Sequence, residues 1–182
     1  MLRILFAALA LLSAAVHAKD WAVDPAASTL GFGGTYQGEK FSGRFTRFEA
    51  AIRFDPADLT ASRFDVSIDV TSAATGNADY DGQLATREFF DFAHFAKAHF
   101  VTHGFKPAGK DFVADGTLTI RDRSQPVTLE VEFEPNGDGA TLDVRTTLKR
   151  LDFGIGSGDW ADTGVIANEV PVSAHLVLKP QR

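Results

Sequence analysis

The sequence predicts an all-β domain in which eight antiparallel strands close into a single barrel. Apolar and polar residues alternate over most of the chain, which is the pattern of strands with one buried face. Turn-forming segments separate these runs by short distances, so sequential strands are expected to pair as antiparallel neighbours. An even number of strands with one apolar face each can close on itself and leave no free edge. A two-sheet sandwich is the alternative.

The expected strands follow from the alternation. In one of them Phe64, Val66 and Ile68 alternate with polar neighbours, and the other runs obey the same rule. The eight expected strands are 28–36, 41–54, 63–71, 98–106, 112–121, 126–134, 140–149 and 169–179. Two segments break the rhythm. Residues 75–97 predict one or two short helical turns, and residues 151–168 predict a loop rich in glycine and aspartate.

The N-terminus has the parts of a secretory signal peptide. Arg3 precedes an apolar run that extends from Ile4 to Val16, and Val16-His17-Ala18, which ends in a small residue, suits signal peptidase. We expect residues 1–18 to be removed after Ala18, which leaves 19–182 as one domain in the periplasm or outside the cell. A membrane anchor is the alternative, but the run is shorter than the ~20 apolar residues that cross a bilayer.

Composition narrows the possible functions. The chain contains no cysteine, which excludes thiol catalysis, thiolate metal sites and iron–sulfur clusters. The formal charge is −6 and no cluster of lysine or arginine is present, so we expect no binding to nucleic acid. Phenylalanine is abundant, with 16 residues against 2 tyrosines and 2 tryptophans.

Three motifs that often carry chemistry lack their required context. The glycines of 154–158 are followed by more loop rather than by a helix, so a tight turn is expected instead of a phosphate site. His99 and His103 on one strand would lie ~13 Å apart, too far to share a metal ion. No serine lies in a nucleophile elbow. We therefore expect no catalytic residue, no metal and no cofactor.

The phenylalanines are the strongest chemical signal. Six fall between residues 89 and 105, and others lie on inward positions of the strands. The inward phenylalanines are Phe32, Phe45, Phe48, Phe54, Phe64, Phe112 and Phe133. An eight-stranded barrel either fills its interior with side chains or holds one small ligand. Composition leaves both possibilities open.

A series of short motifs runs along the whole mature chain. These motifs are Trp21-x-Val23-Asp24, Ser28-x-Leu30-x-Phe32, Phe41-x-Gly43-x-Phe45, Gly76-Asn77-Ala78, Glu88-Phe89-Phe90-Asp91, Gly116-x-Leu118-Thr119-Ile120 and Arg150-x-Asp152-Phe153-Gly154-Ile155. In their order and spacing, the chain resembles the YceI-like family of exported polyisoprenoid-binding domains.

The resemblance implies a lipocalin-like barrel whose elongated apolar interior holds a polyprenyl lipid or an isoprenoid quinone as its ligand. It also implies export, a link to stress responses, a homodimer, and association with a membrane haem-b cytochrome. Two alternative functions remain open. One is a fully packed barrel that acts as an interaction protein for such a cytochrome, and the other is an enzyme that acts on a lipid.

On this reading the site residues fall into three groups. The barrel wall would consist of Leu30, Phe32, Phe45, Phe48, Phe54, Val66, Ile68, Phe100, Leu118, Ile120, Leu129 and Val131. The mouth or lid would consist of Phe89, Phe90, Phe153 and Trp160. Arg150 and Asp152 would meet a polar headgroup, or would form a buried structural ion pair.

Overall fold

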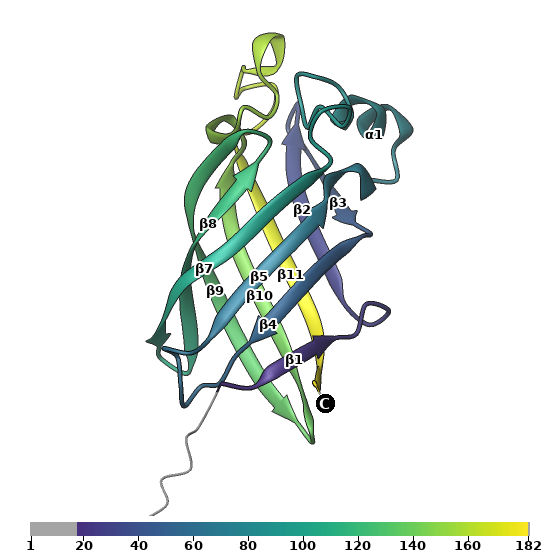
Figure 1. The fold of residues 1–182 in the computed structure, drawn as a ribbon. Coiled ribbons are helices and arrows are strands. Elements are labelled where there is room, and N and C mark those ends of the chain that lie inside the picture. The colour runs from purple at the N-terminus through teal and green to yellow at the C-terminus, as the bar shows by residue number, and fades with distance from the viewer. Residues whose placement is uncertain (1–17, 182) are drawn as a thin grey trace, which may run out of the picture.

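A computed structural model describes residues 18–181, so the expected signal peptide lies outside the described residues except for Ala18. The elements are β1 (Asp20–Val23), β2 (Thr29–Tyr36), β3 (Glu39–Phe45), β4 (Phe48–Arg53), β5 (Arg63–Asp69), η1 (Val70–Ser72), β6 (Ala73–Ala74), α1 (Ala78–Leu84), β7 (Lys97–Ala108), β8 (Asp111–Ile120), β9 (Arg123–Asn136), β10 (Gly139–Lys149), η2 (Arg150–Phe153), η3 (Gly158–Trp160) and β11 (Glu169–Pro180). Figure 1 shows these strands wrapped around one axis.

The strands form a closed ring. Antiparallel pairing runs in the order β1–β4–β5–β7–β8–β9–β10–β11, and β11 pairs back to β1. Farther along, the same edge of β11 pairs with β2, which pairs with β3, which pairs with β6. Three strands of the barrel are therefore each divided into two segments. The first consists of β1 and β2, the second of β3 and β4, and the third of β5 and β6. Counted in this way, the described chain is an eight-stranded antiparallel barrel, and the sandwich alternative is wrong.

The two ends of the barrel differ. One end carries α1 and the long loop between β10 and β11, and lies at the top of Figure 1. We call it the mouth end. β1 crosses the other end, at the bottom of the figure, which we call the closed end. Within residues 18–181, no helix is long and apolar enough to cross a membrane.

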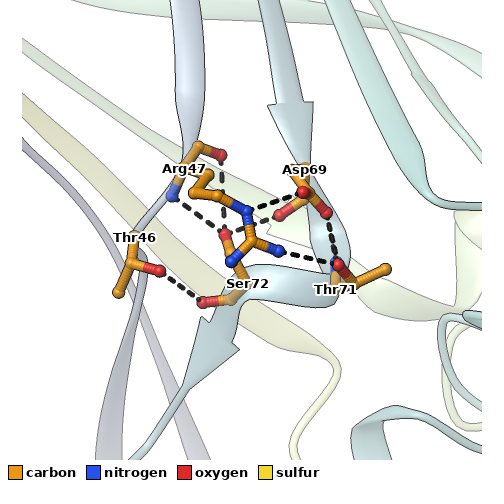
Figure 2. A network of polar contacts seen from close by, with 5 residues as sticks. All are labelled: Thr46, Arg47, Asp69, Thr71 and Ser72. Carbon is orange, nitrogen blue, oxygen red and sulfur yellow. Dashed lines mark hydrogen bonds and ion pairs between the residues drawn. The ribbon is translucent and has the colours of Figure 1, made fainter.

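One expected strand, 41–54, is divided in the structure. Thr46 and Arg47 separate β3 from β4, and η1 bends the neighbouring strand at the same height. Figure 2 shows how the two bends are joined. Ser72 Oγ accepts a hydrogen bond from Arg47 N at 3.0 Å, and the Arg47 guanidinium donates to Asp69 Oδ2 at 2.9 Å and to Thr71 Oγ1 at 3.0 Å. These contacts provide partners for backbone and side-chain groups where the ladder is broken.

The inward faces follow the expected alternation. Along β5, Phe64 is buried and the side chains of Val66 and Ile68 follow it on the same face. β7 has one irregularity, because the register shifts between Thr102 and Gly104. This β-bulge adds His103 as an extra residue on the outer face. Strict alternation from Phe100 would place Phe105 on the outer face, but the extra residue moves Phe105 to the inner face, where it contacts Phe54.

The two segments without strand pattern are also close to expectation. Residues 75–97 contain α1, whose first turn is capped by Asn77 Oδ1, followed by turns. Residues 151–168 contain most of η2 and all of η3, so this loop is more structured than the sequence indicates.

The closed end is packed solid with aromatic rings. The aromatic plug consists of Trp21, Phe54, Phe105, Phe112 and Phe133. The Phe54 ring is fully buried at its centre, with ring centroids 5.0 Å from Phe133, 5.2 Å from Phe112 and 5.4 Å from Phe105. Trp21 closes the end and donates its Nε1–H to the Phe54 carbonyl oxygen at 2.9 Å. A buried indole N–H needs such a partner.

Candidate functional site

On the mouth side of the aromatic plug, the barrel contains a cavity of about 220 Å³. Inward side chains from most strands line it, and α1, η2 and the loop before β11 contribute further residues. The lining is almost entirely aliphatic, aromatic or glycine, and its polar members are Thr146, Arg150 and Ser173. The interior is therefore packed at one end and hollow at the other, which answers the question that composition left open.

Most of the expected wall residues border this cavity. They are Leu30, Phe32, Phe45, Phe48, Val66, Ile68, Phe100, Leu118, Ile120 and Leu129. The structure places the remaining two elsewhere. Phe54 lies in the aromatic plug, and Val131, 1% exposed, is part of the buried core but does not border the cavity, although its ladder partner Val144 does. Both side chains point inward as expected, but neither borders the cavity.

Several cavity residues were missed by the sequence analysis. Leu142 and Leu176 have the same inward alternation as the expected wall, so the pattern could have identified them. Leu84, Ile155 and Ile166 come from α1 and from the loop after β10. No strand pattern marks these three, and only the folded chain brings them to the wall.

Three phenylalanines on the wall lie over glycines of a neighbouring strand. Phe32 covers Gly43 so closely that a Cβ at Gly43 would collide with the ring. Phe41 covers Gly34 in the same way, and Phe100 covers Gly116. Each ring lies flat against the sheet instead of extending across the barrel. These pairs keep space open in an interior that is rich in phenylalanine.

The mouth is covered by two segments that are bonded to each other. Phe89, Phe90 and Phe153 line the cavity. Trp160 does not border it but packs edge-on against Phe89, with the ring centroids 5.9 Å apart. The carbonyl oxygen of Glu88 accepts the backbone N–H of Gly156 at 2.7 Å, which ties the segment after α1 to the segment after η2.

Arg150 organises the second of these segments. Its side chain is 4% exposed, and its guanidinium donates to five backbone carbonyl oxygens at 2.7–3.1 Å. The acceptors belong to Ile155, Gly156, Trp160, Ile166 and Ala167. A guanidinium has five N–H donors, so all of them are occupied. Burial lowers the pKa of Arg150, because the charged form has lost its water.

Asp152 is not the partner of Arg150. The Asp152 residue is exposed, and its backbone carbonyl oxygen accepts a hydrogen bond from Gln125 Nε2 at 3.1 Å. Within residues 18–181 no ion pair joins it to Arg150. The structure therefore offers neither the buried ion pair nor a pair of free charges for a headgroup. Arg150 instead stabilises the loop by binding its backbone.

The glycine-rich loop is a turn, as expected. Gly154, Gly156 and Gly158 have φ values of +70°, +67° and +62°, a region that favours glycine. At Gly156 a Cβ would also lie 2.5 Å from Arg150 Nη1, so the close approach of backbone and guanidinium requires a glycine there. The three-residue η3 that follows is no helix of the kind that binds phosphate.

The four histidines of residues 18–181, which are His94, His99, His103 and His175, lie on the outside of the barrel, each beside a polar neighbour. His99 Nε2 lies 2.6 Å from Asp65 Oδ1, and His175 Nδ1 lies 2.9 Å from Asp143 Oδ1. Over residues 18–181 no three histidine, cysteine or acidic side chains come together in a way that would hold a metal ion.

The sequence and the fold match known proteins. Residues 21–178 match the family model described as YceI-like domain. "Protein YceI" of Salmonella arizonae is 30% identical over 134 residues, which cover 70% of this chain and 68% of the relative. The protein of the same name from Salmonella newport matches equally well.

Solved structures agree with this match. Burkholderia cenocepacia BcnA is 34% identical and superimposes with a TM-score of 0.82. The match covers 86% of this chain and 99% of the BcnA chain. A polyisoprenoid binding domain from Saccharophagus degradans shares the fold at 18% identity, with a TM-score of 0.70 over 91% of this chain and 100% of that chain. From its match over nearly the whole described barrel, this chain belongs to the YceI-like family.

Proposed function

We propose that the barrel binds the apolar chain of one isoprenoid lipid, a polyprenyl lipid or an isoprenoid quinone, and carries or sequesters it outside the cytoplasmic membrane. The observation that carries this proposal is the apolar cavity on the mouth side of the aromatic plug. Transfer of a methylene from water to such a site contributes ~0.8 kcal/mol, so an apolar chain needs no charged contact to bind. The Saccharophagus degradans domain of the same fold, named for polyisoprenoid binding, supports the choice of ligand.

The cavity favours binding over catalysis. Among its lining residues Arg150 is the one charged side chain, and all of its N–H groups are bonded to carbonyl oxygens. No carboxylate, histidine or lysine lines the described cavity. General acid–base catalysis needs such a group within hydrogen-bond reach of the reacting atom. A packed interaction protein is also less well supported, because the interior contains this cavity.

The lipid leaves or enters at the mouth end. The aromatic plug fills the closed end, where Phe54 and its ring neighbours leave no route. A headgroup would therefore lie near the mouth segments, outside the reach of any free charge in the wall. Export is proposed from residues 1–18, and Lys19 already belongs to the barrel, since its carbonyl oxygen accepts the Phe54 N–H at 2.9 Å. The homodimer and the cytochrome partner stay predictions.

The test is direct detection of the ligand. Protein purified without detergent from its own host should release about one polyprenyl compound per chain on organic extraction, and its native mass should exceed that of the chain from Lys19. Delipidated protein should then take up an isoprenoid quinone in titration. Protein that arrives empty and takes up no isoprenoid would favour the packed interaction protein.

Two neighbouring alanines offer a matched pair of variants. Ala50 lines the cavity, whereas Ala51 is exposed on the outer face of the same strand. Ala50→Phe should fill the cavity and abolish uptake. Ala51→Phe adds the same ring outside the barrel and should leave uptake unchanged. Equal uptake by both variants would show that the ligand binds elsewhere.

A further inference from the structure

The boundary between the cavity and the packed interior can be followed on β10, β11 and β4, which lie close together in the ring, since only β1 separates β11 from β4. On β4 the last inward residue at the cavity is Ile52, and the next, Phe54, belongs to the plug. On β10 the boundary falls at Leu142, and on β11 at Leu176. Leu142 and Leu176 are direct partners in the β10–β11 ladder, so the cavity ends at the same level on these two strands.

Phe64 forms the part of the cavity floor that adjoins the aromatic plug. It pairs with Ile52 across the β4–β5 ladder and is 2% exposed. Its ring borders the cavity and also contacts the plug, with centroids 4.8 Å from Phe105 and 5.8 Å from Phe54. Neither Phe105 nor Phe54 borders the cavity. The Phe64 ring thus separates the cavity from a region filled only by other side chains.

The floor limits the length of chain that fits. A protein cavity of 150 Å³ holds benzene, with six carbon atoms. By that ratio the 220 Å³ above Phe64 accommodates about nine carbon atoms, roughly two isoprene units of five carbons each. The volume is also below the ~300–1,000 Å³ of ordinary ligand pockets. A longer chain must leave its remaining units at the mouth.

We propose that Phe64 is a specificity-determining residue, which sets the number of isoprene units buried in the barrel at about two. This inference rests on the proposed function, since it presumes that an isoprenoid chain enters the cavity end-first. The chain's terminal methyl groups then lie against the Phe64 ring. Removal of the ring opens space toward the plug and lets a further unit enter.

The experiment is calorimetric titration of the delipidated protein with prenol, geraniol, farnesol and geranylgeraniol, which have one to four isoprene units. For the wild type, affinity should rise at least about tenfold from prenol to geraniol, because each buried carbon contributes. It should rise less than about threefold for each further unit. Phe64→Leu should bind farnesol about tenfold more tightly than the wild type and bind geraniol with unchanged affinity.

Phe105→Leu is the matched control. It makes the same change in a ring that contacts Phe64 but does not border the cavity, so the wild-type length profile should persist. Leucine keeps the site apolar, so folding is expected, and circular dichroism checks it. If the affinity of the wild type rose steadily through four isoprene units, or if both variants changed the length profile in the same way, the role of Phe64 would be wrong while the proposed function would stand. Binding of none of the alcohols would overturn the proposed function as well.

Discussion

Phe32 on β2 lies flat across Gly43 on β3, its direct partner in the antiparallel ladder. The ring fills the place where a side chain at position 43 would stand. On the cavity side the ring also contacts Phe45, with the centroids 5.1 Å apart. The absence of a Cβ at Gly43 therefore decides where a large apolar ring lies, and with it how much of the barrel stays hollow.

The first prediction follows from this pair. Gly43→Ala should push the Phe32 ring into the cavity, reduce the uptake of isoprenoid by at least about tenfold, and cost ~1–3 kcal/mol through overpacking. Titration and urea unfolding measure the two effects. Gly31→Ala is the control, because its Cβ would meet neighbours only at 3.6 Å or more, an ordinary contact. Unchanged uptake by Gly43→Ala would show that the position of Phe32 does not control the cavity.

The second prediction concerns Arg150. Arg150→Met leaves five backbone carbonyl oxygens without their donors, and a buried polar group without a partner costs ~1–3 kcal/mol. We expect the free energy of unfolding to fall by at least about 3 kcal/mol. Arg150→Lys should recover little of this, because an ammonium has three donors and no planar fork.

The control for Arg150 is Arg145→Met, at an exposed position on β10 whose guanidinium lies 3.9 Å from Glu132 Oε2. Exposed pairs of this kind contribute little, so the change should stay within about 0.5 kcal/mol. Equal and small losses for Arg145→Met and Arg150→Met in urea unfolding would mean that the loop holds its shape without the guanidinium.

The third prediction concerns pH and the contacts in Figure 2. Hydrogen bonds from Thr71, and then from Arg47, hold the pKa of the Asp69 carboxyl below its usual value. A carboxyl with a lowered pKa in the folded state stabilises the protein above the unfolded pKa of ~3.9, and this contribution is lost as the pH falls through the folded pKa. Asp69→Asn should therefore cost ~1 kcal/mol at pH 7.

The measurement for Asp69 is the free energy of unfolding in urea at a series of pH values between 7 and 3. The gap between wild type and Asp69→Asn should be constant down to about pH 5 and then shrink toward acid pH. Ser157→Ala, at an exposed position without a titratable side chain, should show no such trend. A gap at Asp69 that widens toward acid pH would contradict the sign of the effect.

Much of the fold could be predicted because alternation reports which face of a strand is buried. The inward positions of β5, β8, β9 and β11 agree with the sequence pattern. The division of 41–54 has a sequence signal as well. Phe45 and Phe48 are three residues apart, so the inward phase slips at Thr46 and Arg47, where β3 ends and β4 begins.

The site was harder to predict, because alternation reports the face and not the height along the barrel axis. Phe54 and Phe48 share a face of one run, yet one lies in the plug and the other at the cavity. Their heights depend on the stagger of all the strands, which no single strand reveals. The role of Arg150 could not be predicted for another reason. Its partners are carbonyl oxygens, and every residue has one, so the sequence carries no signal for them.

The central claim, a ligand chain in a partly hollow barrel, is tested most directly by two truncations measured with and without farnesol. Phe54→Ala, in the plug, should cost ~3–5 kcal/mol in denaturant unfolding whether or not farnesol is present. Phe32→Ala, at the cavity, should cost only about 1–2 kcal/mol in the delipidated protein, since open space already lies beside the ring. With farnesol its cost should grow, because weaker binding reduces the ligand's contribution to stability. The same large cost for Phe32→Ala in both conditions would contradict the account.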